Sequence, residues 1–328
     1  MSLDLFFANL FSPPILFFIL GITATLVRSD LEVPAPLPKL FSLYLLWAIG
    51  FKGGVALREA GLTVDALTPV VAAVLLSGAL ALLGFLVFRR LFGFDDACAL
   101  AASYGSVSVV TFVTAADFLD GRGIEYGGQM VAALALMESP PIIVALILKR
   151  LIGPGGAEAE PISAIVRGAV TSGPVFLLMG SLVAGLLTPE AALEPLKPFT
   201  YDIFAGVLVF FLLEAGMTSG QRLGELRKQG LPTIGLGIAI PIVNAAIGMG
   251  VAYLIGLGKG EALLLTILAG SASYIAVPAA MRLAVPNANS GLYLPMSLGV
   301  TFPFNVCIGI PVYLILIQAI WPEAAASP

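Results

Sequence analysis

The chain contains two short Gly-Ser motifs that each interrupt an apolar segment. One covers residues 105–108, and the other covers residues 270–273, about 165 positions later. Glycine lets a backbone leave helical geometry at low cost, and serines two positions apart supply hydroxyls where the helical hydrogen bonds are broken. A helix that resumes after such a break presents free N–H groups and the positive end of its dipole. Two such ends that face each other can bind a small anion without a cationic side chain.

The two motifs therefore form the predicted anion site. The candidate substrate-binding positions are Gly105, Ser106, Val107, Ser108, Gly270, Ser271, Ala272 and Ser273. Thr111 lies one turn beyond the first break and Pro278 shortly after the second, which fits the same interpretation. The alternative is that glycine and serine only allow helices to pack closely. The recurrence of the motif in both halves favours the broken-helix interpretation.

Charged side chains inside apolar segments are candidates for ion coupling. Glu138 lies near the middle of its segment, where a carboxylate costs about 3 kcal/mol or more unless it is paired or protonated, which suits a proton carrier. Lys52 either extends to the outer interface or pairs with Glu138 in the transport core. Glu214 either couples ions or lies near a helix end. The complete candidate set for ion coupling is Lys52, Glu138, Tyr274, Thr111 and Glu214.

The composition argues against most catalytic and metal sites. The absence of histidine removes the commonest general base and the commonest metal ligand. Cys98 and Cys307 are far apart in apolar segments and are expected to be small buried hydrophobes. A dyad of Ser106 or Ser108 with Lys52 leaves an intramembrane enzyme as an alternative, which covalent labelling of the serines would reveal. A passive anion channel is a second alternative, which single-channel currents would reveal. We expect no catalytic residue and no resident cofactor.

The elements that must position these residues are transmembrane helices. Apolar residues make up 59% of the chain, charged residues make up 11%, and the mean hydropathy is +1.03. This composition predicts an all-α polytopic membrane protein in a lipid bilayer, and the net charge of -4 does not suggest a nucleic-acid partner. The ten predicted helices cover roughly residues 12–28, 39–57, 67–90, 96–119, 126–150, 165–187, 199–220, 231–256, 262–283 and 292–320.

The ten helices divide into two copies of a five-helix repeat. The first copy is residues 1–152, the second is residues 165–328, and a cytoplasmic linker covers residues 153–164. Besides the Gly-Ser motifs, two further landmarks repeat at nearly the same offset: residues 50–54 with 216–220, and residues 138–140 with 301–303. An odd number of spans per copy inverts the second copy in the bilayer, with the broken helices in spans four and nine.

The positions of lysine and arginine predict the orientation of the chain. Eleven of them lie in the odd-numbered connections: Arg28, Lys39, Arg89, Arg90, Lys149, Arg150, Arg167, Arg222, Arg227, Lys228 and Arg282. Four lie on the opposite side: Arg58, Arg122, Lys197 and Lys259. Because cytoplasmic loops carry the excess of positive charge, both termini are expected outside, with the linker in the cytoplasm.

At these motifs the chain resembles the sodium-dependent bicarbonate transporter family first associated with cyanobacterial carbon uptake. The resemblance rests on residues 50–58, 105–108, 138–140 and 270–282, and it runs over nearly the whole length. It implies a core and a gate domain, elevator-type movement, homotrimers in the plasma (inner) membrane, and a small cytoplasmic regulatory protein as partner. It also implies bicarbonate between the broken helices, bound largely by backbone amides, with sodium beside it.

Three positions depart from the family pattern. Tyr274 stands where the family has an aspartate, Lys52 where it has a threonine, and Glu138 where it has an aspartate. Relative to the family, this chain loses a carboxylate at Tyr274 and gains an ammonium at Lys52. This change is expected if the lysine side chain takes the place of a bound sodium ion. Ser108 and Ser273 remain candidate ligands of a sodium ion. The sequence thus predicts a secondary transporter of a small anion, bicarbonate first, coupled to sodium or to protons.

Overall fold

The computed structural model describes residues 2–34, 36–61, 63–153, 167–168, 171, 173–226 and 230–321, and the predicted linker lies almost wholly outside them. All regular secondary structure in these residues is helical, as predicted. The main helices are α1 (Ser2–Leu10), α2 (Pro13–Leu26), α3 (Pro36–Ala60), α4 (Val64–Phe88), α5 (Phe94–Gly105), α6 (Val109–Asp120), α7 (Gln129–Met137), α8 (Ser139–Ile152), α10 (Gly173–Leu187), α11 (Phe204–Leu226), α12 (Leu231–Leu254), α13 (Lys259–Ala269), α14 (Ala276–Ala284), α15 (Ser290–Met296), α16 (Phe302–Phe304) and α17 (Ile310–Ile320).

Seven helical stretches in the described residues are long and apolar enough to cross a membrane. They are Pro36–Glu59, Ala66–Phe88, Phe94–Asp120, Gln129–Ile152, Pro198–Arg222, Leu231–Leu254 and Ser290–Ile320. Pro13–Leu26 and Gly173–Leu187 are apolar but shorter. The remaining predicted span is divided between α13 and α14. The multi-pass membrane class is therefore confirmed, while the number ten stays a prediction.

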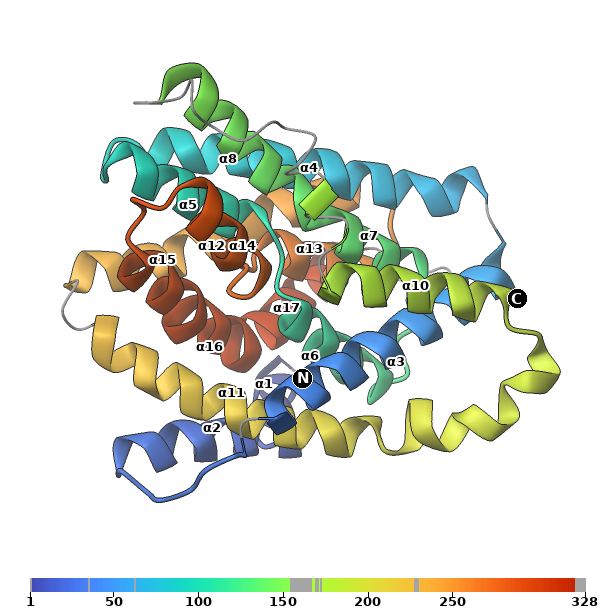
Figure 1. Ribbon diagram of the computed structural model, residues 1–328. Helices are drawn as coiled ribbons and strands as arrows, with labels where there is room; N and C mark the ends of the chain where they lie inside the picture. Colours follow the sequence, from blue (N-terminus) through green and yellow to red (C-terminus); the bar gives the residue numbers. More distant parts are fainter. Residues whose placement is uncertain are drawn as a thin grey trace.

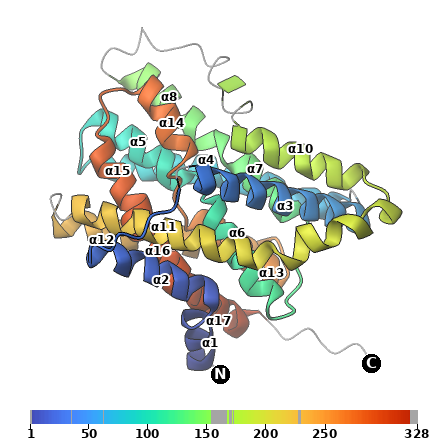
Figure 2. The ribbon, with the colours of Figure 1, turned by 60° about the horizontal axis from the view of Figure 1, so that its bottom comes forward.

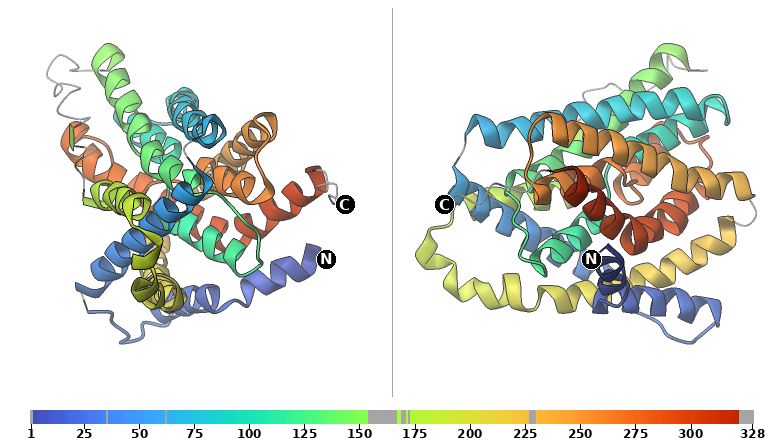
Figure 3. Two further views of the ribbon diagram at one scale, coloured as in Figure 1. Left: turned by 90° about the vertical axis from the view of Figure 1, so that its right-hand side faces the viewer. Right: turned by 180° about the vertical axis from the view of Figure 1, so that it is seen from behind.

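Two pairs of helices pack at very short distance because glycines face the partner helix. Helix α2 runs along α11, and α3 runs along α10 (Figure 1). A methyl group on Gly21 would lie 2.1 Å from the Leu213 carbonyl oxygen, and one on Gly185 would lie 2.1 Å from that of Phe51. Small residues allow this close approach between helices in membranes. We call α2, α3, α10 and α11 the four-helix group; its blue and yellow segments gather at the lower left of Figure 3, left.

The other helices form a central group around the two interrupted spans. Helix α4 packs on α5, and α12 packs on α13, so that each interrupted span has one long neighbour (Figure 2). Gly105, the last residue of α5, lies against Ala81 of α4; Gly270, directly after α13, lies against Ala245 of α12. A Cβ atom at either glycine would lie less than 3 Å from its alanine neighbour. The glycines thus bring both breaks close to a supporting helix.

The last span is less regular than the single helix predicted over residues 292–320. Two π-helical segments, Ser297–Thr301 and Asn305–Gly309, alternate with α-helical ones between Ser290 and Ile320. Pro295, Pro303 and Pro311 recur every eight residues along it. Proline removes a helical hydrogen bond and crowds the preceding turn, and a wider π turn is one way in which a helix accommodates this.

The N-terminal residues form a helix that lies outside the ten predicted spans. Helix α1 is too short to span a membrane, and it packs against the C-terminal span. The buried side-chain amide of Asn9 donates a hydrogen bond to the Val306 carbonyl oxygen at 3.1 Å. The π-helical segment that contains Val306 therefore has a polar contact from the other end of the chain.

Candidate functional site

Both predicted interruptions are present in the structure. Helix α5 ends at Gly105, the backbone is extended at Ser106 and Ser108, and α6 begins at Val109. The second interruption lies between the end of α13 at Ala269 and the start of α14 at Ala276. In hydrocarbon such non-helical backbone persists only where it is buried in protein or lines a cavity. The serines of both motifs are at most 4% exposed, which satisfies this requirement.

The two interruptions cross and bond to each other. The Ser108 N–H donates to Ser271 Oγ at 3.0 Å, and the Ser273 N–H donates to the Ser103 carbonyl oxygen at 2.8 Å. These bonds satisfy part of the backbone that leaves the helices. They also fix the start of α6 and the start of α14 relative to each other, although about 165 residues separate them in sequence.

The hydroxyl of Ser108 connects several of the predicted site residues. It caps α6 by accepting from the Thr111 N–H at 3.2 Å, and it also accepts from the Thr111 hydroxyl at 2.8 Å. It lies 3.4 Å from the hydroxyl of Tyr274, to which it donates. The ring of Tyr274 meets Phe302 edge-on at 5.5 Å between ring centroids. Tyr274 therefore places a neutral hydroxyl at the crossing.

A cavity of about 420 Å³ leads to this crossing, and we call it the Tyr274 cavity. Its wall combines the start of α14 with one face of α11. The lining residues from these two elements are Phe211, Glu214, Ala215, Thr218, Arg222, Tyr274, Ile275 and Pro278. The Glu214 carboxylate accepts a hydrogen bond from the Thr218 hydroxyl at 2.9 Å, one turn along the same helix. The predicted residues Glu214 and Tyr274 thus share one cavity.

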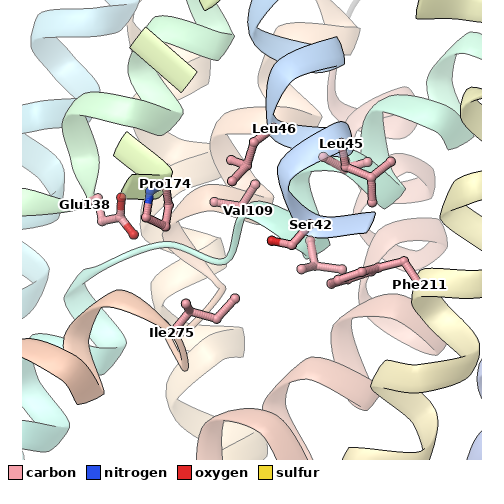
Figure 4. Close-up of a pocket in the computed structure, with 10 residues that line it drawn as sticks. Ser42, Leu45, Leu46, Val109, Glu138, Pro174, Phe211 and Ile275 are labelled. Carbon is pink, nitrogen blue, oxygen red and sulfur yellow. The ribbon is translucent and has the colours of Figure 1, made fainter. Parts of the chain in front are cut away.

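A second, smaller cavity adjoins the first, and we call it the Glu138 cavity. Its volume is about 30 Å³, close to that of one water molecule. Val109 and Val110 from the first turn of α6 line it. Glu138 lies on the opposite side of the cavity from Ser42 and Phe211 (Figure 4). Its remaining lining is Leu45, Leu46, Val113, Pro174 and Ile275. Ser42, Phe211 and Ile275 line both cavities.

Lys52 lies elsewhere, in a third cavity of about 320 Å³ that we call the Lys52 cavity. Its ammonium pairs with Asp120, at 3.5 Å between Nζ and Oδ2. The predicted pairing of Lys52 with Glu138 is therefore wrong. The physical reason is helical rise: Leu45, which lines the Glu138 cavity, precedes Lys52 by about 10 Å along α3. Lys52 also does not form a dyad with Ser106, whose hydroxyl donates to the Glu138 carbonyl oxygen at 3.3 Å.

Two asparagines that were not among the predicted site residues donate hydrogen bonds at the crossing. Asn244 donates to the Tyr104 carbonyl oxygen at 3.0 Å, and Asn305 donates to that of Gly270 at 2.8 Å. Each bond satisfies a carbonyl group next to an interruption, where the helical partner is lost. Both asparagines are buried in apolar spans. That sequence context, a lone amide in an apolar helix, was the available signal.

Several oxygen atoms near the crossing have no hydrogen-bond partner among the described residues. They are Ser103 Oγ, Thr266 Oγ1 and Asn305 Oδ1, all buried. Neutral oxygens of this kind suit a hard cation or ordered water. Within the described part of the chain, no group of three or more His, Cys, Asp or Glu side chains forms a metal site.

The fold and the site define a multi-pass helical membrane transporter. Two interrupted helices meet in the interior of the protein, and the Tyr274 cavity reaches the second interruption. A sequence profile of the Na+-dependent bicarbonate transporter superfamily matches residues 13–318, and the chain belongs to this superfamily. A comparison of the chain with curated proteins found no match.

Proposed function

We propose that the protein is a secondary transporter of a small oxyanion, with bicarbonate as the first candidate. The observation that carries this proposal is that two adjoining cavities meet at the N-termini of both α6 and α14. Val109 and Val110 belong to the first turn of α6, and Tyr274 and Ile275 directly precede α14. The first N–H groups of a helix lack intrahelical partners and lie at the positive end of its dipole. A small anion is the ligand that such a place favours.

Neutral hydroxyls complete the proposed site. Ser108 and Tyr274 already lie next to each other at the crossing, and Ser42 faces both cavities from α3. These groups donate hydrogen bonds without adding charge. An oxyanion with three oxygens matches several such donors, whereas a halide would use them less fully.

Two acidic residues border the same space, and this supports coupling to a cation. Glu138 lines the small cavity and Glu214 lines the larger one. A substrate anion next to an ionised carboxylate in a poorly hydrated cavity is strongly unfavourable. A proton on Glu138, or a sodium ion beside the substrate, removes that repulsion. We propose one of these as the coupling ion, and Glu138 as the residue that responds to it.

Where sodium is the coupling ion, neutral oxygens of the chain would hold it. Ser108 and Ser273 remain candidates, together with the unpartnered oxygens of Ser103 and Asn305 near the second interruption. Sodium supplies positive charge next to the anion when bound. Tyr274 contributes a hydroxyl to this region and no charge.

Equivalent contacts in the two halves support the inverted repeat. Gly21 approaches Leu213 and Met217, and Gly185 approaches Phe51 and Val55. These positions recur in the other half after 164 residues for the two glycines and after 162 residues for their partners. The contact of Gly105 with Ala81 likewise corresponds to that of Gly270 with Ala245. The first helix of each half therefore packs on the second helix of the other half. Such exchange is expected of two copies related by a pseudo-twofold axis.

The same correspondence supports alternating access. Ile49, Lys52 and Ala56 line the Lys52 cavity, and the positions 162 residues later, Phe211, Glu214 and Thr218, line the Tyr274 cavity. The Tyr274 cavity reaches the second interruption, whereas the lining of the Lys52 cavity includes neither Gly-Ser motif. We therefore propose that the site is open here toward the Arg222 side, which the charge distribution assigns to the cytoplasm. Movement of the central group past the four-helix group would open it toward the other side.

The assembly is part of the same proposal. We propose a homotrimer in the plasma membrane with both termini outside, as the family resemblance and the lysine and arginine positions suggest. A small cytoplasmic regulatory protein is proposed as a partner on the resemblance alone. Cross-linking of the purified protein in lipid would test the trimer.

Uptake into proteoliposomes tests the proposed function. Labelled bicarbonate is supplied at alkaline pH, where little of it converts to CO2 that crosses bilayers unaided, and sodium and proton gradients are imposed separately. We expect saturable uptake driven by one of the two gradients. Glu138→Gln should abolish acceleration by a proton gradient, because it removes the titratable group. Glu125→Gln, an exposed carboxylate at the Lys52 cavity, is the matched control.

Three outcomes would contradict the proposal. Uptake that neither gradient accelerates would remove the coupling. Single-channel currents would favour a passive anion channel. Unchanged gradient dependence in Glu138→Gln would show that Glu138 does not respond to the coupling ion.

A further inference from the structure

Lys52 is held by two aromatic rings of its own helix group. Its ammonium lies 4.8 Å from the ring centroid of Tyr201, in the π-helical segment Pro198–Asp202 that leads into α11, and 4.6 Å from that of Phe204, the first residue of α11. Cation–π contacts of this length are attractive, most of all when the cation is partly desolvated. The Lys52 side chain is 13% exposed. The cation is therefore fixed to the four-helix group.

The counterion of Lys52 belongs to the central group. Asp120 is the last residue of α6, the helix that begins at the first interruption. Its carboxylate is 46% exposed and accepts a hydrogen bond from the Tyr126 hydroxyl in the following loop. Burial, with Asp120 next to it, raises the pKa of Tyr126, so the phenol stays protonated as a donor. The Lys52–Asp120 pair thus bridges the two groups of helices.

Helix α3 and the start of α7 are closely packed directly beside this pair. A methyl group on Gly128 would lie 2.0 Å from the Gly53 carbonyl oxygen, and one on Gly53 would lie 2.6 Å from Val131. The part of α3 around Gly53 is therefore in van der Waals contact with the start of α7. These contacts leave no gap between α3 and the start of α7 at this point.

The equivalent position in the other half lacks this bridge. Glu214 corresponds to Lys52 at the offset of 162 residues that the glycine contacts give, and its carboxylate accepts a hydrogen bond from the Thr218 hydroxyl on the same helix. The hydrogen bond of Thr218 stays within α11, whereas the charge contact of Lys52 crosses from one helix group to the other. The two ends of the transport path are thus unequal at related positions.

We infer that Lys52 and Asp120 form an ionic lock that holds the Lys52 side of the transporter closed. The inference rests on the alternating access proposed above. Opening on the Lys52 side separates the ammonium from the carboxylate, so the pair favours the state in which the Tyr274 cavity is open. Removing either charge shifts the population toward the opposite state.

Thiol accessibility in lipid nanodiscs tests this lock, because both faces are then reachable. Cys98 and Cys307 are replaced by alanine, and single cysteines are introduced as Ala56→Cys in the Lys52 cavity and Thr218→Cys in the Tyr274 cavity. Asp120→Asn and Lys52→Met should each raise the rate of maleimide labelling at position 56 about threefold to fivefold, as expected for a partly exposed ion pair. The rate at position 218 should fall.

Two further variants make the result specific. Glu125→Gln removes a neighbouring exposed carboxylate and should leave both rates unchanged. The exchange of charges, Lys52→Asp with Asp120→Lys, should restore part of the wild-type rates. Because Asp120 is half exposed, Asp120→Asn should fold even where Lys52→Met does not.

The outcomes separate this inference from the proposed function. Unchanged labelling in Asp120→Asn, in a protein whose two rates respond in opposite directions to substrate, would overturn the lock alone. Rates that never respond to substrate or to the coupling ion would overturn alternating access itself.

Discussion

Ser108 is the residue at which helix capping and proposed substrate binding coincide. Its hydroxyl accepts from the N–H and from the hydroxyl of Thr111, and it contacts Tyr274 across the crossing. Its own N–H is bonded to Ser271. The position therefore combines a local role, which any N-cap serine has, with a contact between the two halves of the chain.

Ser108→Ala should reduce both stability and transport. We expect a loss of about 1 kcal/mol from the missing N-cap and a raised KM for the transported anion, because one hydroxyl donor is lost. Thr114→Ala is the control: it removes a buried hydroxyl that bonds only to Val110 within α6. Melting temperature in detergent and uptake kinetics would be compared. Equal uptake by the two variants would argue against a role of Ser108 in binding.

The positions of the interruptions could be predicted from single residues, but the charge contacts could not. Glycine followed by two serines marks a place where a helix can stop, and it recurs in both halves. The pairing of Lys52 depended on which carboxylate lay at the same depth. Glu138 and Asp120 were both available, and only the rise along α3 distinguishes them.

At the scale of helices, the short distances between α2 and α11 and between α3 and α10 depend on glycine. Gly185 of α10 contacts the backbone of α3, whereas a Cβ atom at Gly180 of the same helix would meet nothing within 4 Å. Gly185→Ala should therefore destabilise the protein by about 1–3 kcal/mol, since backbone must move, and Gly180→Ala should be neutral or slightly stabilising. Thermal unfolding in detergent would measure both. Similar melting temperatures for the two variants would contradict the role of Gly185.

Helix boundaries were predictable where apolar runs end at charged or turn residues, as at both ends of α12. The irregular last span was not, because prolines in a membrane helix signal a kink without specifying π turns. Helix α1 was also missed: nine residues are too few to register as a span, and its contact with Val306 is distant in sequence.

At the scale of the whole molecule, the proposed orientation in the bilayer rests on the positions of charged residues alone. Ser29 is exposed in the connection after α2, which the positive residues assign to the cytoplasm, and Glu190 is exposed in the connection after α10, on the opposite side. In a cysteine-free background, Glu190→Cys should be labelled by an impermeant maleimide added to intact cells. Ser29→Cys should be labelled only after the membrane is opened. The reverse pattern would invert the proposed orientation.

The crossed pairing of α2 with α11 and of α3 with α10 has a consequence for biosynthesis. When the ribosome has released α3, the glycine-lined faces of α2 and α3 have no partner, and none emerges until the second half of the chain is made. During that interval, α2 and α3 of the nascent protein remain incompletely packed in the bilayer. Neither half is expected to mature alone, whereas two separately translated halves should recover activity when they are made in the same cell.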